Sequence, residues 1–599
     1  MKKLLPVLML ALLLCTAPFQ LFAQGVKISG RVTSAVDGSP IIGATVVAGA
    51  SKRGASTSAD GRFTLQVMNF DKTLEVSFLG MKKQDVSLVK SKTFYEVSLE
   101  EEYNDLDAVV VTGYGQQLKR DITGAITSLS ADDIEVHAGG NINTALQGKI
   151  PGMQIVNTSG EPGAGANISI RGLSSINGSN EPLYIIDGVA IESGNVSTLD
   201  GDATFSPMAG LDLSDIESIE VLKDAASAAI YGSRAANGVI IITTKGSKDT
   251  DFSDPVVTVS HTSSIVSNSR NLDVLTATQF REAYTQSRLN NGNAYPTNDW
   301  IINPNNPLYS RSTDWQDIMF RTVYQHREKV NLRGGNKNFS YTLSFSYKDQ
   351  KPTVVETDYK QYNVRANFNY QMNKWLKGYT SISYAKQDYN RVLSGNSSNT
   401  SVLSTIVKSN PCYWPWDPET GELLDYMGNN EIRNPLALAT HVPYNYNRDW
   451  SILNQRFDIT LMKGLVLRLS GSLDTDNSLQ DSYTPDRFDK ASSFPIDKSR
   501  YKETQKKRYT TENYLTYNYK KRNHRLTAMA GLSIMKQEQK TTKLNGEQFI
   551  DSQIHHIQNA GKLTNLPSVA ESERAELSFF GRVNYTFKDR YIFAFTLRR

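Results

Sequence analysis

The chain has few cysteines and few long apolar runs, and both absences narrow what it can be. Only Cys15 and Cys412 are cysteine among 599 residues, and Cys15 lies inside an N-terminal apolar stretch. An internal disulfide and a cysteine metal site are therefore excluded for the rest of the chain. Beyond residue 23 no run of about 18 apolar residues exists, so the sequence offers no transmembrane helix. If the chain enters a membrane, it must do so as a closed barrel of strands.

The chain also has little net charge and few motifs that could support catalysis or metal binding. The formal net charge is +4, and the basic residues are dispersed, which argues against a nucleic-acid partner. No catalytic triad, paired carboxylate or zinc signature can be placed, so we expect no enzyme, no metal and no cofactor. The run from Asp474 to Ser478 resembles a calcium loop, but Leu479 replaces the required glycine, and a strand end is favoured. Adjacent His555 and His556 would point to opposite faces of a strand, which suits metal binding badly.

The first 23 residues have the pattern of an export signal. Lys2 and Lys3 precede an apolar run at residues 4–14 that is too short to span a bilayer. Residues 21–23, Leu-Phe-Ala, give a cleavage site before Gln24. The sequence therefore predicts that the protein leaves the cytoplasm.

A small antiparallel β-sandwich is predicted for the next segment, up to about residue 100. Short apolar stretches alternate with turn signals, among them Asp-Gly dipeptides at residues 37–38 and 60–61. The expected strands are 28–32, 44–47, 63–67, 74–78 and 95–99.

An acidic linker then leads to an apolar run at residues 106–115, Leu-Asp-Ala-Val-Val-Val-Thr-Gly-Tyr-Gly. By itself, a β-branched run closed by Gly-Tyr-Gly is typical of an ordinary buried strand. A strand at the end of a polar linker is also suited to pair with the sheet edge of another protein. The residues alone leave both interpretations open.

Residues 116–245 alternate helix and strand signals and predict a compact α+β domain. Helical spacing occurs at 142–150 and 224–231. The Gly-rich stretch 160–165 lacks the lysine and the following helix of a phosphate-binding loop, so its glycines are expected to serve turns. The expected strands are 154–156, 167–172, 216–222 and 238–244, together with 181–189, which is expected to be a strand that runs into a tight turn.

Beyond residue 250 the sequence has the period of two that a water-lined, lipid-facing barrel requires. At residues 340–347 apolar or aromatic side chains alternate with Ser and Thr. The same two-sidedness recurs at 362–370, 465–472 and 577–586. A soluble sandwich would also have one polar face, so this pattern alone does not decide between the two.

Connection lengths separate the barrel from the sandwich. Short and long connections alternate along the chain, as in outer-membrane barrels, whereas a sandwich has no reason to sort its loops this way. Short turns are expected near 335–337, 373–374, 463–464, 521–522 and 589–590. Long connections are expected at 265–324, 349–360, 387–449, 476–505 and 537–574.

In the predicted sandwich, the stretches Gly30-Arg31-Val32, Ile42-Gly43-Ala44 and Asp60-Gly61-Arg62-Phe63 resemble the carboxypeptidase regulatory-like (transthyretin-like) module. Further motifs follow in order: the run at 106–115, Ala-Leu-Gln-Gly-Lys-Ile-Pro-Gly-Met at 145–153, Ile-Arg-Gly at 170–172, and the segments 182–189 and 215–245. Together they resemble the TonB-dependent outer-membrane transporters, and more narrowly the SusC/RagA type of Bacteroidetes. The expected fold is mainly β, with a β-sandwich module, an α+β plug and a partial antiparallel transmembrane β-barrel.

The resemblance implies a division into five parts. These are a signal peptide at 1–23, the sandwich at 24–100, a linker with a TonB box at 101–115, a plug at 116–247 and barrel strands at 248–599. About ten or eleven strands can be placed, roughly half of the 22 in plugged transporters. Since unpaired strand edges are costly in lipid, we expect a truncated barrel that a missing C-terminal part closes.

The resemblance also implies site residues. TonB would bind Asp107, Ala108, Val109, Val110, Val111, Thr112, Gly113 and Tyr114. The plug motif would comprise Arg171, Gly172, Tyr184, Asp187, Gly188, Lys223, Asp224, Tyr231, Gly232 and Gly238. In a proline-punctuated loop, Tyr413, Trp414 and Trp416 are suited to stack on sugar rings or contact a peptide, and equally to pack on the plug or a partner.

The expected function is TonB-dependent active import of an oligosaccharide or peptide across the outer membrane. The implied partners are inner-membrane TonB, a SusD-like surface lipoprotein and outer-membrane lipid, with the sandwich and the TonB box in the periplasm. The alternative is a passive surface receptor or adhesin without energised transport.

Overall fold

The computed structural model describes most of the chain. The described residues are 26–35, 38–49, 51, 53–68, 71–78, 81–89, 92–99, 109–112, 115–118, 124–134, 140–176, 179–191, 196–197, 204–246, 254–292, 301–303, 305, 311–393, 401–427, 432–488, 496–550 and 556–599. The predicted export signal lies outside them. The chain forms two compact units, residues 1–109 with 118–120 and residues 110–117 with 121–599, and each is described by itself.

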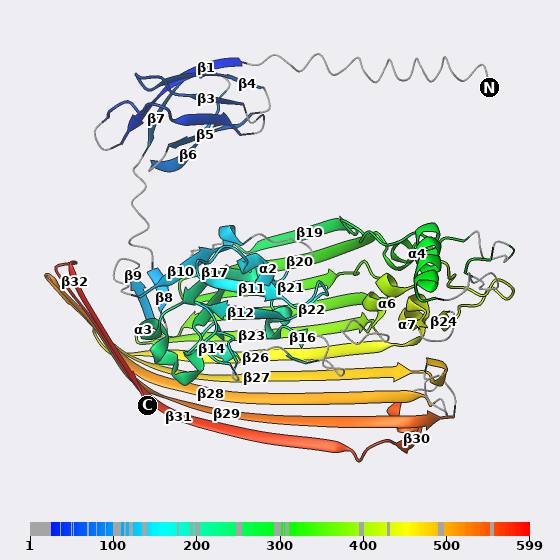
Figure 1. The fold of residues 1–599 in the computed structure, drawn as a ribbon. Coiled ribbons are helices and arrows are strands. Elements are labelled where there is room, and N and C mark those ends of the chain that lie inside the picture. Colours follow the sequence, from blue (N-terminus) through cyan, green and yellow to red (C-terminus); the bar gives the residue numbers. More distant parts are fainter. Residues whose placement is uncertain are drawn as a thin grey trace. The chain divides into compact units, whose positions relative to one another are not determined.

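The first unit contains a two-layer β-sandwich (Figure 1). One sheet has the order β4-β1-β7 and the other β3-β2-β5-β6. Alternate side chains such as Val32, Val46 and Leu74 are fully buried between the layers, which is the period of two expected of strands with one wet face. The strands are β1 (Val26–Ser34), β2 (Thr45–Ala48), β3 (Gly54–Ser56), β4 (Arg62–Val67), β5 (Thr73–Phe78), β6 (Met81–Ser87) and β7 (Phe94–Leu99).

The five expected strands of this unit are confirmed, and two were missed. β3 and β6 are the edge strands of the second sheet. β6 reads Met-Lys-Lys-Gln-Asp-Val-Ser and is exposed along most of its length, so it carries no apolar alternation to find. Charged edges of this kind protect a sheet from pairing with other chains.

The second unit contains a central α+β domain, residues 124–246. Its five-stranded sheet has the order β10-β17-β18-β13-β14, in which β13 and β18 are parallel and the other pairs antiparallel. The elements are β10 (Ile126–Ser130), α2 (Ile142–Leu146), β11 (Met153–Asn157), β12 (Ala166–Ile170), β13 (Leu183–Ile186), β14 (Val189–Ile191), β15 (Val196–Ser197), β16 (Thr204–Phe205), β17 (Ile216–Leu222), α3 (Ala225–Ala228) and β18 (Val239–Thr244). Short 3-10 helices are η4 (Ala131–Asp133), η5 (Pro207–Gly210), η6 (Leu213–Asp215), η7 (Ala229–Tyr231) and η8 (Ser233–Ala235).

Both helices expected in the central domain are shorter than predicted. α2 ends at Leu146 because Gly148 follows with a φ of 76° and Pro151 comes soon after. α3 begins at the N-cap Asp224 and tightens into η7 after one turn. The expected strands are present, and Gly163 in the Gly-rich stretch has a φ of 72°, as a turn role requires.

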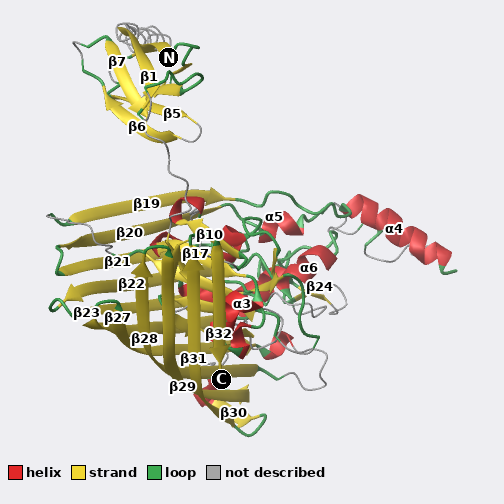
Figure 2. Cartoon of the chain, turned by 90° about the vertical axis from the view of Figure 1, so that its left-hand side faces the viewer, coloured by secondary structure: helices red, strands yellow, loops and turns green. Residues whose placement is uncertain are grey.

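A large antiparallel sheet follows, curved around the central domain (Figures 1 and 2). Its strands pair strictly in chain order, and β30 joins at the side of β29. The strands are β19 (Val256–Val266), β20 (Val323–Gly335), β21 (Phe339–Asp349), β22 (Asp358–Gln371), β23 (Leu376–Arg391), β26 (Tyr444–Met462), β27 (Leu465–Thr484), β28 (Lys498–Lys521), β29 (His524–Phe549), β30 (Ala560–Leu563), β31 (Ser568–Phe587) and β32 (Tyr591–Arg598).

The polarity of this curved sheet is the reverse of that in a water-soluble protein. On β21 the apolar Leu343 and Phe345 are 37% and 46% exposed on the convex face, whereas Ser344 and Ser346 are 5% and 1% exposed. The serines contact the central domain on the concave face. An apolar outer face with a polar interior is the arrangement of a transmembrane barrel, so the two-sidedness expected from the sequence is confirmed.

Short and long connections alternate as predicted, but two long ones are shorter than expected. β27, β28 and β29 are 20, 24 and 26 residues long and extend into the stretches assigned to loops. In their extensions both faces are polar, so the apolar alternation used to find strands is absent there. Asp474 consequently lies in the middle of β27 rather than at a strand end.

The long connections carry helices and a small apolar core of their own. The helices are α4 (Ala277–Asn290), α5 (Trp315–Met319), α6 (Val402–Lys408) and α7 (Pro435–His441), with the short strands β24 (Tyr426–Met427) and β25 (Ile432–Arg433). α5, α6 and α7 pack around buried Met319, Ile406 and Phe488. Among the described residues, no helix has the length and apolarity needed to cross a bilayer.

Candidate functional site

A tight hairpin turn carries one tip of the central domain to the curved sheet. Asp187 and Gly188 connect β13 to β14 with φ of 49° and 88°, which is the Asp-Gly pattern of a two-residue turn between twisted strands. The Asp187 carboxylate accepts hydrogen bonds from Thr244 at 2.9 and 2.7 Å and pairs with Arg365 of β22 at 3.2 Å. Asn454 of β26 donates to its carbonyl oxygen at 3.0 Å. This turn is therefore clamped by two strands of the curved sheet, which is called the wall from here on.

A second contact is formed by Asp212, just before η6. Its carboxylate binds the Arg327 guanidinium of β20 and accepts a hydrogen bond from the Ser346 hydroxyl at 2.7 Å. The backbone N–H and hydroxyl of Ser214 donate to the same carboxylate at 2.9 and 2.8 Å. The side chains of Asp212 and Arg327 are only 6% and 10% exposed, so this is a buried ion pair between the central domain and the sheet.

Asp215, at the end of η6, lies beside this pair and binds three wall side chains. It pairs with Lys329 and accepts a hydrogen bond from Ser344 at 2.9 Å. Arg365, which also binds Asp187, lies 3.8 Å from its second oxygen. Arg365 thus joins the hairpin turn and η6 into one ionic network, defined here as Asp187, Asp212, Asp215, Arg327, Lys329 and Arg365.

Acid should weaken this network only well below neutral pH. Burial raises the pKa of Asp212, but the charges of Arg327 and Lys329 and the bonds from Ser346 and Ser214 outweigh it and lower that pKa from 3.8 to about 2. A depressed pKa contributes stability above pH 3.8 that is lost as pH falls towards 2. We therefore expect the difference in thermal midpoint between the wild type and Asp212→Asn to be constant from pH 7 to 5 and to shrink below about pH 4. Shrinkage already between pH 7 and 5 would contradict this assignment.

A third contact anchors η5 to β26 and β27. Arg448 is 2% exposed and binds Asp476 with two hydrogen bonds of 2.8 Å. It also donates twice to the Pro207 carbonyl oxygen at 3.2 Å. Gly210 allows the close approach, because a Cβ there would lie 2.7 Å from the Trp450 ring.

An aromatic cluster surrounds Phe205, which β16 of the central domain inserts between wall strands. Its ring stacks on Tyr446 at 4.0 Å between centroids and meets the edge of Tyr389 at 6.0 Å. The Arg391 guanidinium lies 5.1 Å from the Phe205 centroid and binds Glu161 at 2.7 Å. Aromatic, cation–π and ionic contacts therefore act together to hold the β16 segment against the wall.

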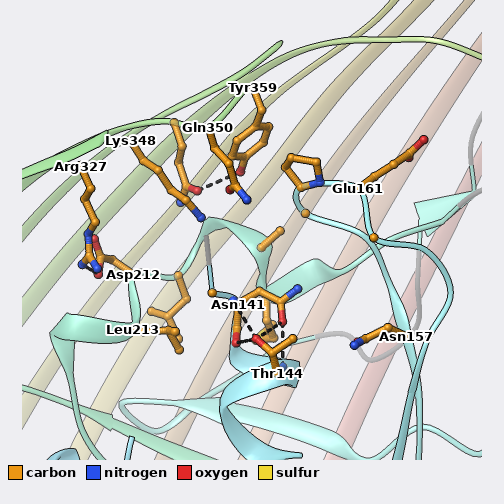
Figure 3. A pocket seen from close by; sticks show the side chains of 18 of the residues that line it. Asn141, Thr144, Asn157, Glu161, Asp212, Leu213, Arg327, Lys348, Gln350 and Tyr359 are labelled. Atoms are coloured by element: carbon orange, nitrogen blue, oxygen red, sulfur yellow. Dashed lines mark hydrogen bonds and ion pairs between the residues drawn. The ribbon is translucent and has the colours of Figure 1, made fainter. Parts of the chain in front are cut away.

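Next to this cluster a pocket opens between the central domain and the wall (Figure 3). Its volume is about 150 Å³. Polar side chains line it from both sides, with Asn141, Thr144 and Glu161 on the central domain and Lys348, Gln350 and Tyr359 on the sheet. Lys348, Gln350 and Tyr359 lie where β21 ends and β22 begins, at the side of the long connections.

The expected plug-motif residues divide into two groups. Asp187, Tyr231 and Gly232 reach the wall. Tyr231 belongs to one buried cluster with Tyr514, Met529 and Phe580, and a Cβ at Gly232 would lie 3.1 Å from Arg598 of β32. The others shape the central domain itself: Asp224 caps α3, Lys223 donates to the Pro151 carbonyl oxygen at 3.2 Å, and Tyr184 is buried in the domain core. Arg171, Gly172, Gly188, Gly232 and Gly238 all adopt positive φ.

The expected TonB-binding residues are described only in part. Val109–Thr112 form β8, which pairs with β9 (Gly115–Leu118) in a two-stranded sheet. Asp107, Ala108, Gly113 and Tyr114 lie outside the described residues.

The loop aromatics lie together in the connection between β23 and β26. Trp414 and Trp416 have centroids 5.3 Å apart, and the Arg311 guanidinium lies 5.2 Å from Trp414. Tyr413 packs on the apolar core of the long connections. All three rings are half-buried. Among the described residues no group of three His, Cys, Asp or Glu side chains is placed to hold a metal ion.

Sequence reasoning missed the contacts that hold the central domain. Asp212 and Phe205 belong to no motif that was singled out. Asp215 and Glu161 lie in stretches that were noted, 215–245 and 160–165, but neither was expected to bind the wall. One signal was present: Arg327 and Lys329 occupy alternate positions of one strand, and cations on the inward face of a barrel need a counterpart. The sequence near Arg327 and Lys329 did not indicate which acidic residues bind them.

Two family models match the chain. Residues 118–239 match the TonB-dependent Receptor Plug Domain, and residues 28–111 match the CarboxypepD_reg-like domain. The central domain is therefore called the plug from here on.

Relatives and solved structures agree with these matches. TonB-dependent receptor P26 of Formosa agariphila is 32% identical over 574 residues, which is 94% of this chain and 55% of that protein. TonB-dependent receptor SusC of Bacteroides thetaiotaomicron is 36% identical over 347 residues, 58% of this chain and 32% of that protein. The structure of the RagAB peptide transporter superimposes with a TM-score of 0.68 at 26% identity, over 80% of this chain and 55% of that one. The two domain matches, the relatives and the RagAB structure together support a TonB-dependent receptor of the SusC/RagA type.

The receptor chain spans about half the length of the curated relatives P26 and P3 of Formosa agariphila, covering 55% and 56% of them. Within that span it carries the elements that define the type: the regulatory-like sandwich, the plug and the wall that holds it. In this chain buried ion pairs and hydrogen bonds hold the plug alongside aromatic and apolar contacts.

Proposed function

We propose that the full-length receptor imports a nutrient, an oligosaccharide or a peptide, across the outer membrane at the expense of energy delivered by TonB. The observation that carries the proposal is the buried ionic network between plug and wall. Once displaced, its charged groups can be solvated by water, which compensates for the lost ion pairs. A plug held in this way can be moved and can return, whereas an apolar interface of the same size would resist separation.

TonB would act on the run at residues 106–115. Pairing of strand with strand transmits a pulling force through backbone hydrogen bonds and asks little of side chains. β8 (Val109–Thr112) already has the extended backbone that such pairing needs. TonB would add to the edge of β8 or displace β9 from it.

The other parts of the proposal follow from the family. The sandwich (24–100) and the linker with the TonB box (101–115) would lie in the periplasm, ahead of the plug (116–247) and the barrel strands (248–599). A SusD-like surface lipoprotein would assist capture on the side of the long connections, where Tyr413, Trp414 and Trp416 are candidates for substrate contact. RagAB is described as a peptide transporter, which supports a peptide as one of the two substrate classes.

The test is deletion of residues 106–112 in the full-length protein. We expect uptake of the substrate to be abolished and its binding at the cell surface to be kept. The deletion removes the segment that TonB would bind and leaves the plug and the wall intact. A control deletes the linker residues that precede the run, at 101–105, and should keep normal uptake. Normal uptake by the 106–112 variant would contradict energised import and favour the alternative, a passive receptor or adhesin.

A further inference from the structure

The pocket between plug and wall contains a cation whose charge the surrounding protein leaves unbalanced. Lys348 lies on the inward face of β21, in register with Arg327 of β20 and Gln361 of β22. It continues the row formed by Ser344 and Ser346, which donate to the carboxylates of the plug. Lys348 is the next inward-facing residue of β21 after Ser346, which binds Asp212.

The nearest acidic group is already occupied. One oxygen of Asp212 accepts from Arg327 and from the Ser214 backbone and hydroxyl, and the other accepts from Ser346. The other acidic side chain of the pocket, Glu161, binds Arg391 at 2.7 Å. Among the described residues no carboxylate forms an ion pair or hydrogen bond with Lys348, whose recorded contact is the Tyr359 ring, 5.9 Å from the ammonium nitrogen to the centroid.

The geometry around the ammonium is open to a ligand. Figure 3 shows Lys348 and Gln350 extending from the wall towards Asn141 and Thr144 of the plug, with the pocket between them. A volume of about 150 Å³ accommodates several non-hydrogen atoms, since a single water needs only about 10–15 Å³ measured in the same way. Half-burying a charge without a counter-ion is costly, so an anion entering here would gain from a group that is already desolvated and in place.

We propose that this pocket binds a carboxylate group of the imported substrate, with Lys348 as the counter-ion and the surrounding amide and hydroxyl groups as hydrogen-bonding partners. This inference rests on the proposed import function and names the substrate chemistry for it. The same group occurs in an acidic oligosaccharide as a uronate and in a peptide as its C-terminus. Tyr359 contacts both the pocket and, with its ring centroid at 5.6 Å, the Tyr389 ring of the Phe205 cluster, so a bound carboxylate lies one residue from a contact that holds the plug.

The experiment measures binding by isothermal titration calorimetry to the purified full-length receptor in detergent. Two pairs of probes are compared: trigalacturonic acid with its methyl ester, and N-acetylated tetra-alanine with a free or an amidated C-terminus. We expect at least one carboxylate probe to bind about 10-fold more tightly than its neutral match, as a charge-assisted bond supplies. The pair that shows the preference identifies the source of the carboxylate.

Three variants assign the preference to Lys348. Lys348→Gln should abolish it, Lys348→Arg should keep most of it, and Lys351→Gln, at an exposed lysine outside the pocket, should leave it unchanged. Equal midpoints of thermal unfolding show that the variants are folded.

The proposal is overturned if neither carboxylate probe binds more tightly than its neutral match. It is equally overturned if neither carboxylate probe binds at all. It is overturned as well if the preference survives in Lys348→Gln. This assay requires neither TonB nor an energised membrane, so its failure leaves the result of the 106–112 deletion standing, and failure of that deletion leaves the binding result standing.

Discussion

Replacing Asp215 by alanine is expected to release the plug from the wall, at a cost of about 3–5 kcal/mol, the range for breaking a buried ion pair by removing one partner. Asp215 binds Lys329, accepts from Ser344 and lies near Arg365. Its loss leaves the buried Lys329 ammonium without the carboxylate that it binds directly. The plug should then become sensitive to protease in the purified full-length protein, and cells carrying the variant should admit a large hydrophilic antibiotic that the wild type excludes.

A double variant separates the uncompensated charge from other effects of Asp215→Ala. In Asp215→Ala with Lys329→Met the unpaired ammonium is removed as well, so part of the lost protection should return, because replacing both members of a buried pair is far less costly than removing one. Asp254→Ala, at an exposed position, is the matched control and should have no effect. Equal protection of the plug in the wild type and Asp215→Ala would show that the ionic network does not hold it.

Arg448→Ala should have a comparable effect at a separate place. It leaves the Asp476 carboxylate and the Pro207 carbonyl without the guanidinium that binds both, again costing about 3–5 kcal/mol. Lysine should be a poor substitute, because a single ammonium cannot reproduce the planar fork of donors. Amide hydrogen exchange should accelerate in η5 (Pro207–Gly210).

Arg270→Ala serves as the control for Arg448→Ala. Arg270 and Asp273 form an ion pair whose side chains are 84% and 97% exposed, and such pairs are worth about 0–1 kcal/mol. The Arg270→Ala variant should leave amide hydrogen exchange in the plug unchanged. If Arg448→Ala also leaves exchange in η5 unchanged, that arginine is not an anchor of the plug.

The parts of the fold that the sequence predicted are those encoded locally. The alternation at residues 340–347 identified both faces of β21, because lipid and water select opposite side chains at every second position. The turn at Asp187 and Gly188 was recognisable because φ above zero at two successive residues suits few residue pairs. The alternation of short and long connections also follows from spacing along the chain.

What the sequence did not predict depends on pairing between distant residues. Asp212 and Arg327 are 115 residues apart, and nothing near either one names the other. Phe205 lies in a two-residue strand that no periodicity reveals, yet its ring contacts two wall tyrosines, Tyr389 and Tyr446. The lengths of β27 to β29 were underestimated for a related reason, since their polar extensions carry no local sign of a strand.

If import draws on the proton-motive force through TonB, substrate should stop accumulating when that force is removed. Accumulation of labelled substrate is followed in cells producing the full-length receptor, before and after a protonophore collapses the membrane potential, with the 106–112 deletion in parallel. We expect the protonophore to reduce accumulation to the level of the deletion variant while surface binding persists. Accumulation that continues at its original rate without the proton-motive force would contradict it.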